Sequence, residues 1–181
     1  MLLPASAVRA QEVLLTADQA LKEIFPEAAR TVPEERPLSD SVRQALQQRL
    51  GRPILERELR ATRVYDTTGA FRGYAVVTEE IGKYRPITFM VGITPALAVR
   101  DVTVMVYRES RGGDVKRERF LSQYRGKTAR DPVALNRDII NISGATISVR
   151  SMNAGVRRVL AEVTAVYAAD PERIAAQDEP R

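Results

Sequence analysis

A run of small and hydroxyl-bearing residues, Ser143-Gly144-Ala145-Thr146-Ile147-Ser148, is the part of the sequence best suited to chemistry. The apolar stretch before it, from Asp138 to Ile142, predicts a short strand, and a helix is predicted from about Ser148. Small residues let the backbone approach a ligand closely, and the free N–H groups of a helix's first turn favour an anion. The pattern indicates a phosphate-sized anion site at 143–148. An ordinary strand-to-helix turn, with Thr146 or Ser148 as the N-cap, is the alternative.

The composition excludes most of the usual catalytic and metal chemistries. The chain has 181 residues and contains no Cys and no His. It therefore has no disulfide, no cysteine-bound iron–sulfur cluster, no c-type haem attachment and no zinc site of the usual kinds. It also lacks the general base of Ser-His-Asp and Cys-His catalysis. We identify no catalytic residue and no metal ligand, so any redox role must rest on an organic cofactor.

Positive charge is concentrated in a basic strip between Arg108 and Arg130, in a chain whose formal net charge is +5. Its cations are Arg108, Arg111, Lys116, Arg117, Arg119, Arg125, Lys127 and Arg130, against the carboxylates Glu109, Asp114 and Glu118. An ordinary solvated face, a site for a phosphorylated ligand and a surface for an acidic partner all fit this strip. We predict no nucleic-acid partner, because the segment has no helix-turn-helix, zinc-finger or aromatic RNA-binding pattern.

The first ten residues have the features of a signal-peptide remnant. Apolar residues at the start run into Ala5-Ser6-Ala7 and Val8-Arg9-Ala10, which both have a small-x-small cleavage pattern. This interpretation places the protein in the periplasm or otherwise outside the cytoplasm, and an unremarkable N-terminus is the alternative. No run of about 18 apolar residues is present, so nothing in the chain as written is predicted to span a membrane.

Residues 11–58 are predicted to form a helical N-terminal segment. A capping-box pattern begins one helix at 16–25. A second helix is predicted over 40–50, with Gly51 as its C-cap. A connector with three prolines, at 26–37, joins the two helices.

The middle of the chain predicts a sheet. β-branched residues indicate strands at 59–65, 71–78, 87–93 and 99–107. Their short connections favour an antiparallel sheet, because parallel strands need crossovers of a dozen or more residues. Helices are predicted at 115–125 and at 148–167, and a loose tail at 171–181. The predicted class is α+β, a central antiparallel sheet flanked by helices, with the long C-terminal helix after the Ser-Gly-Ala-Thr motif.

The six residues 143–148 resemble the signature of the FMN-binding domain family, which includes the extracytoplasmic flavin subunits of the Rnf and sodium-translocating NADH:quinone oxidoreductase complexes. Further similar positions are Tyr84, Ile87 and Met90–Gly92 in the family's first strand, and Phe120, Gln123, Tyr124, Gly126 and Lys127 in a later helix and turn. Glu109-Ser110-Arg111-Gly112-Gly113 lies where members carry a Glu-Thr-Pro-Gly-like loop. The resemblance covers about 72–160, and we assign an FMN-binding domain to 59–170.

The resemblance implies an electron carrier with covalently bound FMN. In the family, a flavin transferase uses FAD to attach FMN through a phosphoester to the last Thr of the motif, which is Thr146 here. Residues 143–145 would line the phosphate, the loop Glu109–Gly113 would lie against the flavin ring, and Arg111 would screen the remaining charge. Ser148 is the next candidate for attachment. The implied partners are the flavin transferase and a membrane-associated redox partner.

One position departs from the family pattern. Flavinylated members usually carry Asp three positions before the Ser of the motif, where this chain has Ile140. A second hypothesis is therefore a non-redox sensor or structural subunit of the same fold that has lost covalent flavin. A standalone flavin enzyme would need an acid–base residue, and the nearest candidates, Tyr107 and Glu109, fit a structural role better. We favour an electron carrier or redox-complex subunit over an enzyme.

Overall fold

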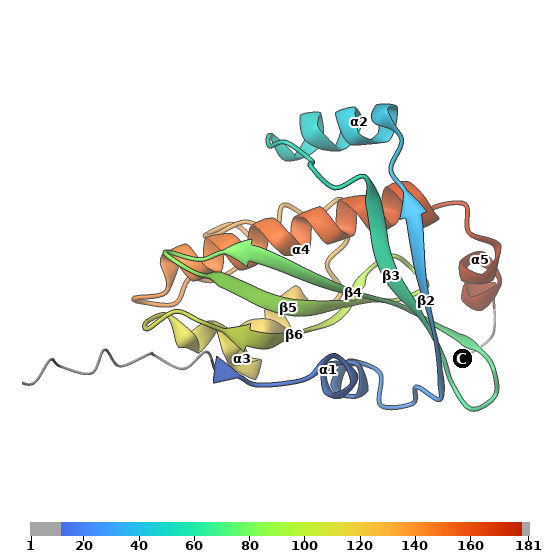
Figure 1. Ribbon diagram of the computed structural model, residues 1–181, viewed down its shortest axis with the longest axis horizontal. Helices are drawn as coiled ribbons and strands as arrows, with labels where there is room; N and C mark the ends of the chain where they lie inside the picture. Colours follow the sequence, from blue (N-terminus) through green and yellow to red (C-terminus); the bar gives the residue numbers. More distant parts are fainter. Residues whose placement is uncertain (1–11, 179–181) are drawn as a thin grey trace, which may run out of the picture.

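The computed structural model describes residues 12–178, which form one antiparallel sheet with helices on both faces (Figure 1). The sheet has six strands in the order β1-β6-β5-β4-β3-β2. The strands are β1 (Glu12–Val13), β2 (Arg30–Pro37), β3 (Glu58–Tyr65), β4 (Phe71–Ile81), β5 (Pro86–Ile93) and β6 (Val99–Tyr107). The α+β class and the antiparallel sheet predicted from the sequence are thus confirmed.

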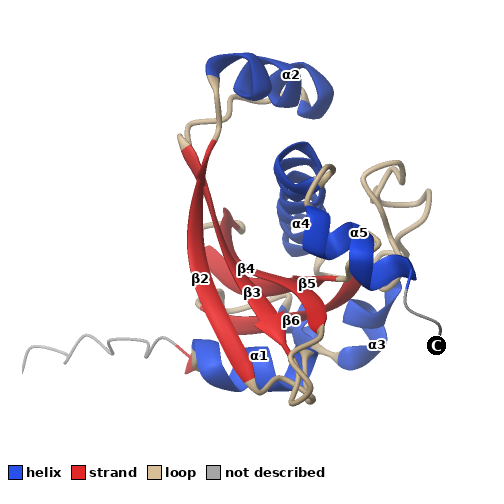
Figure 2. Cartoon of the chain, turned by 90° about the vertical axis from the view of Figure 1, so that its right-hand side faces the viewer, coloured by secondary structure: helices blue, strands red, loops and turns tan. Residues whose placement is uncertain are grey.

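One long helix and one short helix cover opposite faces of the sheet (Figure 2). The helices are α1 (Ala17–Ile24), α2 (Asp40–Leu50), α3 (Glu118–Leu121), α4 (Thr146–Tyr167) and α5 (Pro171–Asp178), with 3-10 turns η1 (Gly113–Lys116) and η2 (Ser122–Tyr124). Helix α4 packs on β3, β4 and β5, and α1 packs on β5 and β6. The predicted capping box of α1 is present, and Gly51 ends α2 in a left-handed conformation as expected.

Two hydrophobic cores follow from this layering. Along β5, Ile87, Phe89, Val91 and Ile93 lie in the larger core with α4, whereas Met90 lies in the smaller core with α1. Successive side chains of a strand point to opposite faces, so a strand covered on both sides is apolar at almost every position. This explains why β5 reads as a continuous apolar run.

The prediction of a proline-containing connector at 26–37, within the helical segment 11–58, was wrong over Arg30–Pro37. The proline-containing stretch is strand β2, which pairs with β3 along its whole length. Proline cannot donate a ladder hydrogen bond, but it is tolerated in a strand with only one neighbour. Strand β2 is such an edge strand, so Pro33 and Pro37 do not prevent its pairing.

The prediction of a loose tail at 171–181 was also wrong, because Pro171–Asp178 is helix α5. Asp170 stabilises the start of α5 by accepting a hydrogen bond from the Arg173 N–H. The Asp170 carboxylate also pairs with Arg63 of β3, which holds the helix against the sheet. Residues 179–181 lie outside the part of the chain that the structure describes.

Two further elements differ from expectation. Residues 138–142 form no strand, because Asn136, in a left-handed conformation, donates its N–H to the Ile139 carbonyl and closes the segment into a loop. The helix expected at 115–125 is divided into η1, α3 and η2, and extended backbone at Arg117 separates the first two.

The predicted signal-peptide remnant at 1–10 lies outside the described residues. Between residues 12 and 178 no helix combines the length and apolarity needed to cross a membrane.

Candidate functional site

Two segments that are far apart in the sequence line one cavity of about 480 Å³. The first is 109–111, in the loop after β6, and the second is 144–148, at the start of α4. The tip of the β4–β5 hairpin completes the wall with Lys83 and Tyr84. The structure therefore brings together the two loops that the sequence singled out.

The motif lies at the N-terminus of α4, which begins at Thr146 rather than at about Ser148. Its N-cap is Ala145, and no described side chain caps the first turn. The alternative in which Thr146 or Ser148 serves as the N-cap is therefore wrong. Gly144 has a φ of 78°, and no described atom lies within 4 Å of where its Cβ would be. The uncapped turn and the open space over Gly144 leave room for an anion against the backbone.

Of the three hydroxyl-bearing residues of the motif, only Thr146 both lines the cavity and is partly exposed. Thr146 is half-buried, and its Oγ1 accepts a hydrogen bond of 3.0 Å from Nδ2 of Asn141. Ser148 also lines the cavity, but it is buried and its Oγ is hydrogen-bonded to the Tyr107 hydroxyl at 3.2 Å. Ser143 is exposed and is not part of the cavity wall.

Tyr107 fixes the loop 109–113 against the start of α4. Its hydroxyl donates to the Arg111 carbonyl at 2.5 Å, and burial raises its pKa. A Cβ at Gly112 would lie 2.8 Å from Ser148 Oγ and 3.0 Å from the Tyr107 hydroxyl, so only glycine allows this approach. Gly112 thus lets the loop pack closely against Ser148 and Tyr107, next to the cavity wall. Gly113 lies beside Lys116.

Glu109 holds the tip of the β4–β5 hairpin at the cavity. Its Oε1 accepts hydrogen bonds from the backbone N–H groups of Tyr84 (2.5 Å) and Arg85 (2.9 Å). These bonds fix the backbone that carries Tyr84, so Glu109 has a positioning role in this structure.

Replacing Glu109 by Ala is expected to loosen the hairpin tip. The loss of two charge-assisted bonds at an exposed position should lower the free energy of unfolding by about 1 kcal/mol. Hydrogen exchange should accelerate at the amides of Tyr84 and Arg85 and stay unchanged in β3. Ser110→Ala, next in the chain, is the control. Equal exchange rates at the tip in wild type and Glu109→Ala would contradict this role.

The cavity wall combines apolar and cationic side chains. Tyr84 is 75% exposed and Ile147 is 44% exposed, although large apolar side chains are usually covered. Lys83 and Arg111 add positive charge to the same wall. An apolar surface for a planar ring beside cations and a helix N-terminus for a phosphate is a chemical fit to FMN.

Sequence reasoning missed Lys83 and Ile147 as wall residues, and it placed Tyr84 only in a strand. An aromatic residue between two cations in a tight connection, Lys83-Tyr84-Arg85, was the available signal.

Ion pairs within the fold compensate much of the basic strip from Arg108 to Arg130. Arg108 pairs with Glu79, Arg117 with Asp114, Arg125 with Asp101 and Glu118, and Lys127 with Asp138. The strip is therefore not a uniform cationic face.

Comparison with known proteins identifies a domain within the chain. Residues 82–161 match the FMN-binding domain family. The chain contains an FMN-binding domain. Its matched part begins at the hairpin tip and ends within α4, so it includes every residue of the cavity wall.

The fold is similar to that of NqrC from Shewanella oneidensis, known from a crystal structure. The TM-score is 0.56 at 17% sequence identity, and the alignment covers 92% of this chain and 95% of that chain. At this identity the similarity shows a shared fold. No curated protein is similar enough to count as a match.

Proposed function

We propose that this FMN-binding domain is an electron-transfer protein whose FMN is attached through a phosphoester to Thr146. The observation that carries the proposal is the position of Thr146, a partly exposed residue in the wall of the cavity that the segments 109–111 and 144–148 line together. Bound FMN supplies the capacity to accept and donate electrons, so the chain needs no Cys or His for redox chemistry.

The attachment uses FAD as the donor and a flavin transferase as the catalyst. A bond forms between Thr146 Oγ1 and the FMN phosphorus, the bond between the two phosphates of FAD breaks, and AMP leaves. The hydroxyl proton is lost to the transferase or to solvent. Because Asn141 donates to Oγ1, the Thr146 hydrogen is not used in that bond and is available for removal.

The residues of the wall have separate roles in this proposal. Lys83 and Arg111 offset the negative charge of the phosphodiester, and the uncapped first turn of α4 adds a favourable dipole. Tyr84 and Ile147 offer the apolar contact for the flavin ring. Glu109 acts through the hairpin that carries Tyr84.

A membrane-associated redox partner and an extracytoplasmic location complete the proposal. Sequencing the N-terminus of native protein tests the location. A mature chain that starts near Gln11 supports export, and a cytosolic protein that retains Met1 contradicts it.

The direct test of the proposed function is the intact mass after co-expression with a flavin transferase. A gain of one FMN per chain, lost when the transferase is omitted, supports the proposal. The alternative is a non-redox module, and one observation favours it: Ile140 stands where flavinylated relatives usually have Asp, and its side chain is 76% exposed.

Ile140→Asp is expected to raise the fraction of chain that acquires FMN. The side chain at 140 faces solvent, so a carboxylate fits there without a burial penalty and is open to contact by the transferase. Intact mass gives the fraction, and Ile140→Asn is the uncharged control of matched size. If neither wild type nor Ile140→Asp acquires flavin, the electron-carrier proposal fails and the non-redox module stands.

A further inference from the structure

A second cavity, of about 610 Å³, lies beside helix α4 where strands β3 and β4 separate. The register of these two strands ends at the pair Thr62–Ala75. Beyond this pair β3 stays paired with β2, and β4 with β5, so the two strands diverge (Figure 1). The residues that line the gap are Glu56–Glu58 and Arg60 around the start of β3, Val76–Glu79 on β4, and Arg158 and Glu162 on α4. None of them lines the cavity at Thr146.

Glu162 brings a buried oxygen without a hydrogen bond to this wall. The residue is 3% exposed, and its Oε1 has no hydrogen-bond partner among the described residues. Arg158 Nη1 lies 3.7 Å from this oxygen, which is too far for a hydrogen bond. Buried polar atoms are normally hydrogen-bonded, so this oxygen indicates that a donor is missing.

The charges around Glu162 do not balance when its carboxyl group is ionised. Arg158 donates to Glu56 and to Glu80, and Arg52 donates twice to Glu80. Three carboxylates then stand against two guanidinium groups, which leaves one negative charge in excess. A cation in the cavity would compensate this charge and supply the missing donor.

The rest of the wall favours a cation with an apolar part. Its other charged residues are at least partly exposed, namely Glu56, Arg57, Glu58, Arg60 and Glu79. Val76 and Val77 of β4 contribute apolar surface to the same wall. Among the carboxylates of the wall, only Glu162 is buried.

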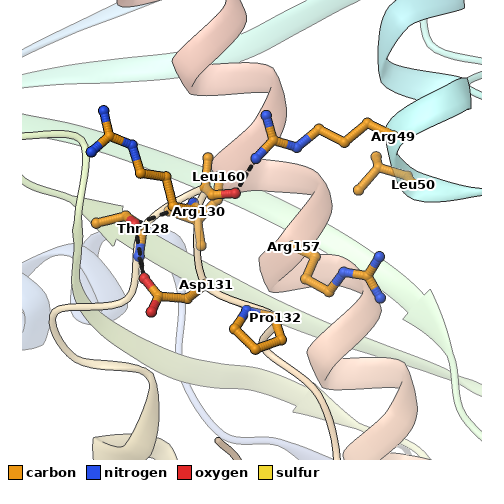
Figure 3. Close-up of a pocket in the computed structure, with 9 residues that line it drawn as sticks. Arg49, Leu50, Thr128, Arg130, Asp131, Pro132, Arg157 and Leu160 are labelled. Carbon is orange, nitrogen blue, oxygen red and sulfur yellow. Dashed lines mark hydrogen bonds between the residues drawn. The ribbon is translucent and has the colours of Figure 1, made fainter. Parts of the chain in front are cut away.

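The smaller recess between α2, the loop 128–132 and α4 has no comparable group (Figure 3). Its Arg130 and Arg157 point away from each other, and Arg49 donates to the Ala129 carbonyl. Within residues 12–178, no buried side-chain atom without a hydrogen-bond partner belongs to its wall. The unsatisfied carboxyl oxygen therefore distinguishes the cavity between β3 and β4.

We propose that the cavity between β3 and β4 binds a small aliphatic amine, whose ammonium group donates to Glu162 while its chain lies against the valines of β4. An ammonium group is a compact charge that can bond a single oxygen, whereas a guanidinium fork is matched to two. The last torsion of a glutamate side chain is soft, so the carboxylate can turn toward such a ligand. Residues 12–178 form no cluster of three or more metal-binding side chains, so the wall suits an amine better than a metal ion. This inference is independent of FMN.

The test is a titration of the full-length, ¹⁵N-labelled chain at pH 8 with butylamine and, separately, with the uncharged butan-1-ol. Ionic strength is held constant with sodium chloride. With butylamine, the amides of Val76, Thr78 and Glu162 are expected to shift along saturable curves with one common Kd. The absence of saturable shifts, or an equal Kd for butan-1-ol, would overturn the inference.

Glu162→Gln should raise the Kd for butylamine about tenfold or more at pH 8, because it removes the charged acceptor. Glutamine is nearly isosteric and neutral, so this variant keeps the packing of α4 and avoids a buried charge. Glu23→Gln is the matched control, since it removes the same charge from an exposed position on α1, which covers the opposite face of the sheet. The same loss of affinity in Glu23→Gln would contradict a site at Glu162.

The pH dependence of the Kd is a second readout. Burial raises the pKa of Glu162 to about 7, and an alkylamine resembles lysine, whose amine has a pKa of about 10.4. Between pH 6 and pH 8 the ligand therefore stays charged while Glu162 ionises, and the wild-type Kd should fall about tenfold. In Glu162→Gln the Kd should not change over this range. A wild-type Kd that is constant or rises with pH would overturn the inference.

Discussion

Thr146→Ala is expected to abolish all flavin that survives denaturation. The substitution removes the oxygen that would form the phosphoester, so no flavin fluorescence should remain on a denaturing gel after co-expression with the transferase. Folding should change little, since Thr146 is the first helical residue and its hydroxyl caps no N–H. Alanine is also the most favourable residue inside a helix.

The controls for this prediction come from the same motif. Thr146→Ser keeps a hydroxyl and should retain some flavin, and Ser148→Ala should retain it fully, because the buried Ser148 hydroxyl is bonded to Tyr107. Covalent flavin that persists in Thr146→Ala and disappears in Ser148→Ala would move the attachment to Ser148.

Glu162→Gln is expected to stabilise the protein at alkaline pH and to have little effect at acidic pH. Glu162 is 3% exposed on α4, and its Oε1 has no hydrogen-bond partner among the described residues. Burial raises the pKa of this carboxyl from 4.5 to about 7, although the Arg158 charge opposes the shift. Arg158 Nη1 is 3.7 Å away, too far for a hydrogen bond.

The surrounding charges explain why Arg158 does not satisfy Glu162. Arg158 donates to Glu56 at 2.8 Å, to Glu80 at 3.2 Å and to Thr78 at 2.6 Å. Arg52, the other nearby cation, makes a two-pronged pair with Glu80. Both cations are thus engaged by other acceptors.

The direction of this pH effect follows from whether Glu162 holds its proton in the folded and unfolded states. Between about pH 4.5 and 7 the unfolded chain has lost the Glu162 proton while the folded chain keeps it, so wild-type stability falls as the pH rises. A shift of the Glu162 pKa from 4.5 to about 7 corresponds to a loss of about 3 kcal/mol in the free energy of unfolding. Wild type has lost this full amount at pH 8.

Glutamine is neutral throughout, so urea unfolding of Glu162→Gln and wild type should differ by about that amount at pH 8 and by much less at pH 4.5. Thr164→Ala, on the same helix, changes no titratable group, so it is the control and should show a difference independent of pH. A constant difference for Glu162→Gln would contradict the raised pKa.

The elements that could be predicted from the sequence are those whose apolar residues recur at a regular helical or strand spacing. Helix α4 buries Val149, Met152, Val156, Val159 and Val163, a helical spacing visible in the sequence alone. Strand β5 was equally clear from its β-branched and aromatic residues. Strand β2 was not, because it is charged and proline-containing and owes its conformation to pairing with β3.

The candidate site was predictable only in part, for the same reason. Small residues at 143–148 and the glycines after Glu109 are local signals of close backbone approach. The contribution of Lys83 and Tyr84 depends on where the hairpin tip lies in space, and Glu109 fixes that position from a distant strand end.

Strand β2 also limits how the open edge of the sheet can pair with another molecule. An open sheet edge offers unpaired N–H and C=O groups to a strand from another molecule. Here the edge carries Pro33 and Pro37, which have no N–H to offer, and the charged residues Glu34, Glu35 and Arg36 stand between them. A second copy that paired with this edge would lose ladder bonds at both prolines. The proline-containing residues of β2, which resembled a connector in the sequence, therefore disfavour edge-to-edge pairing of the sheet with another molecule.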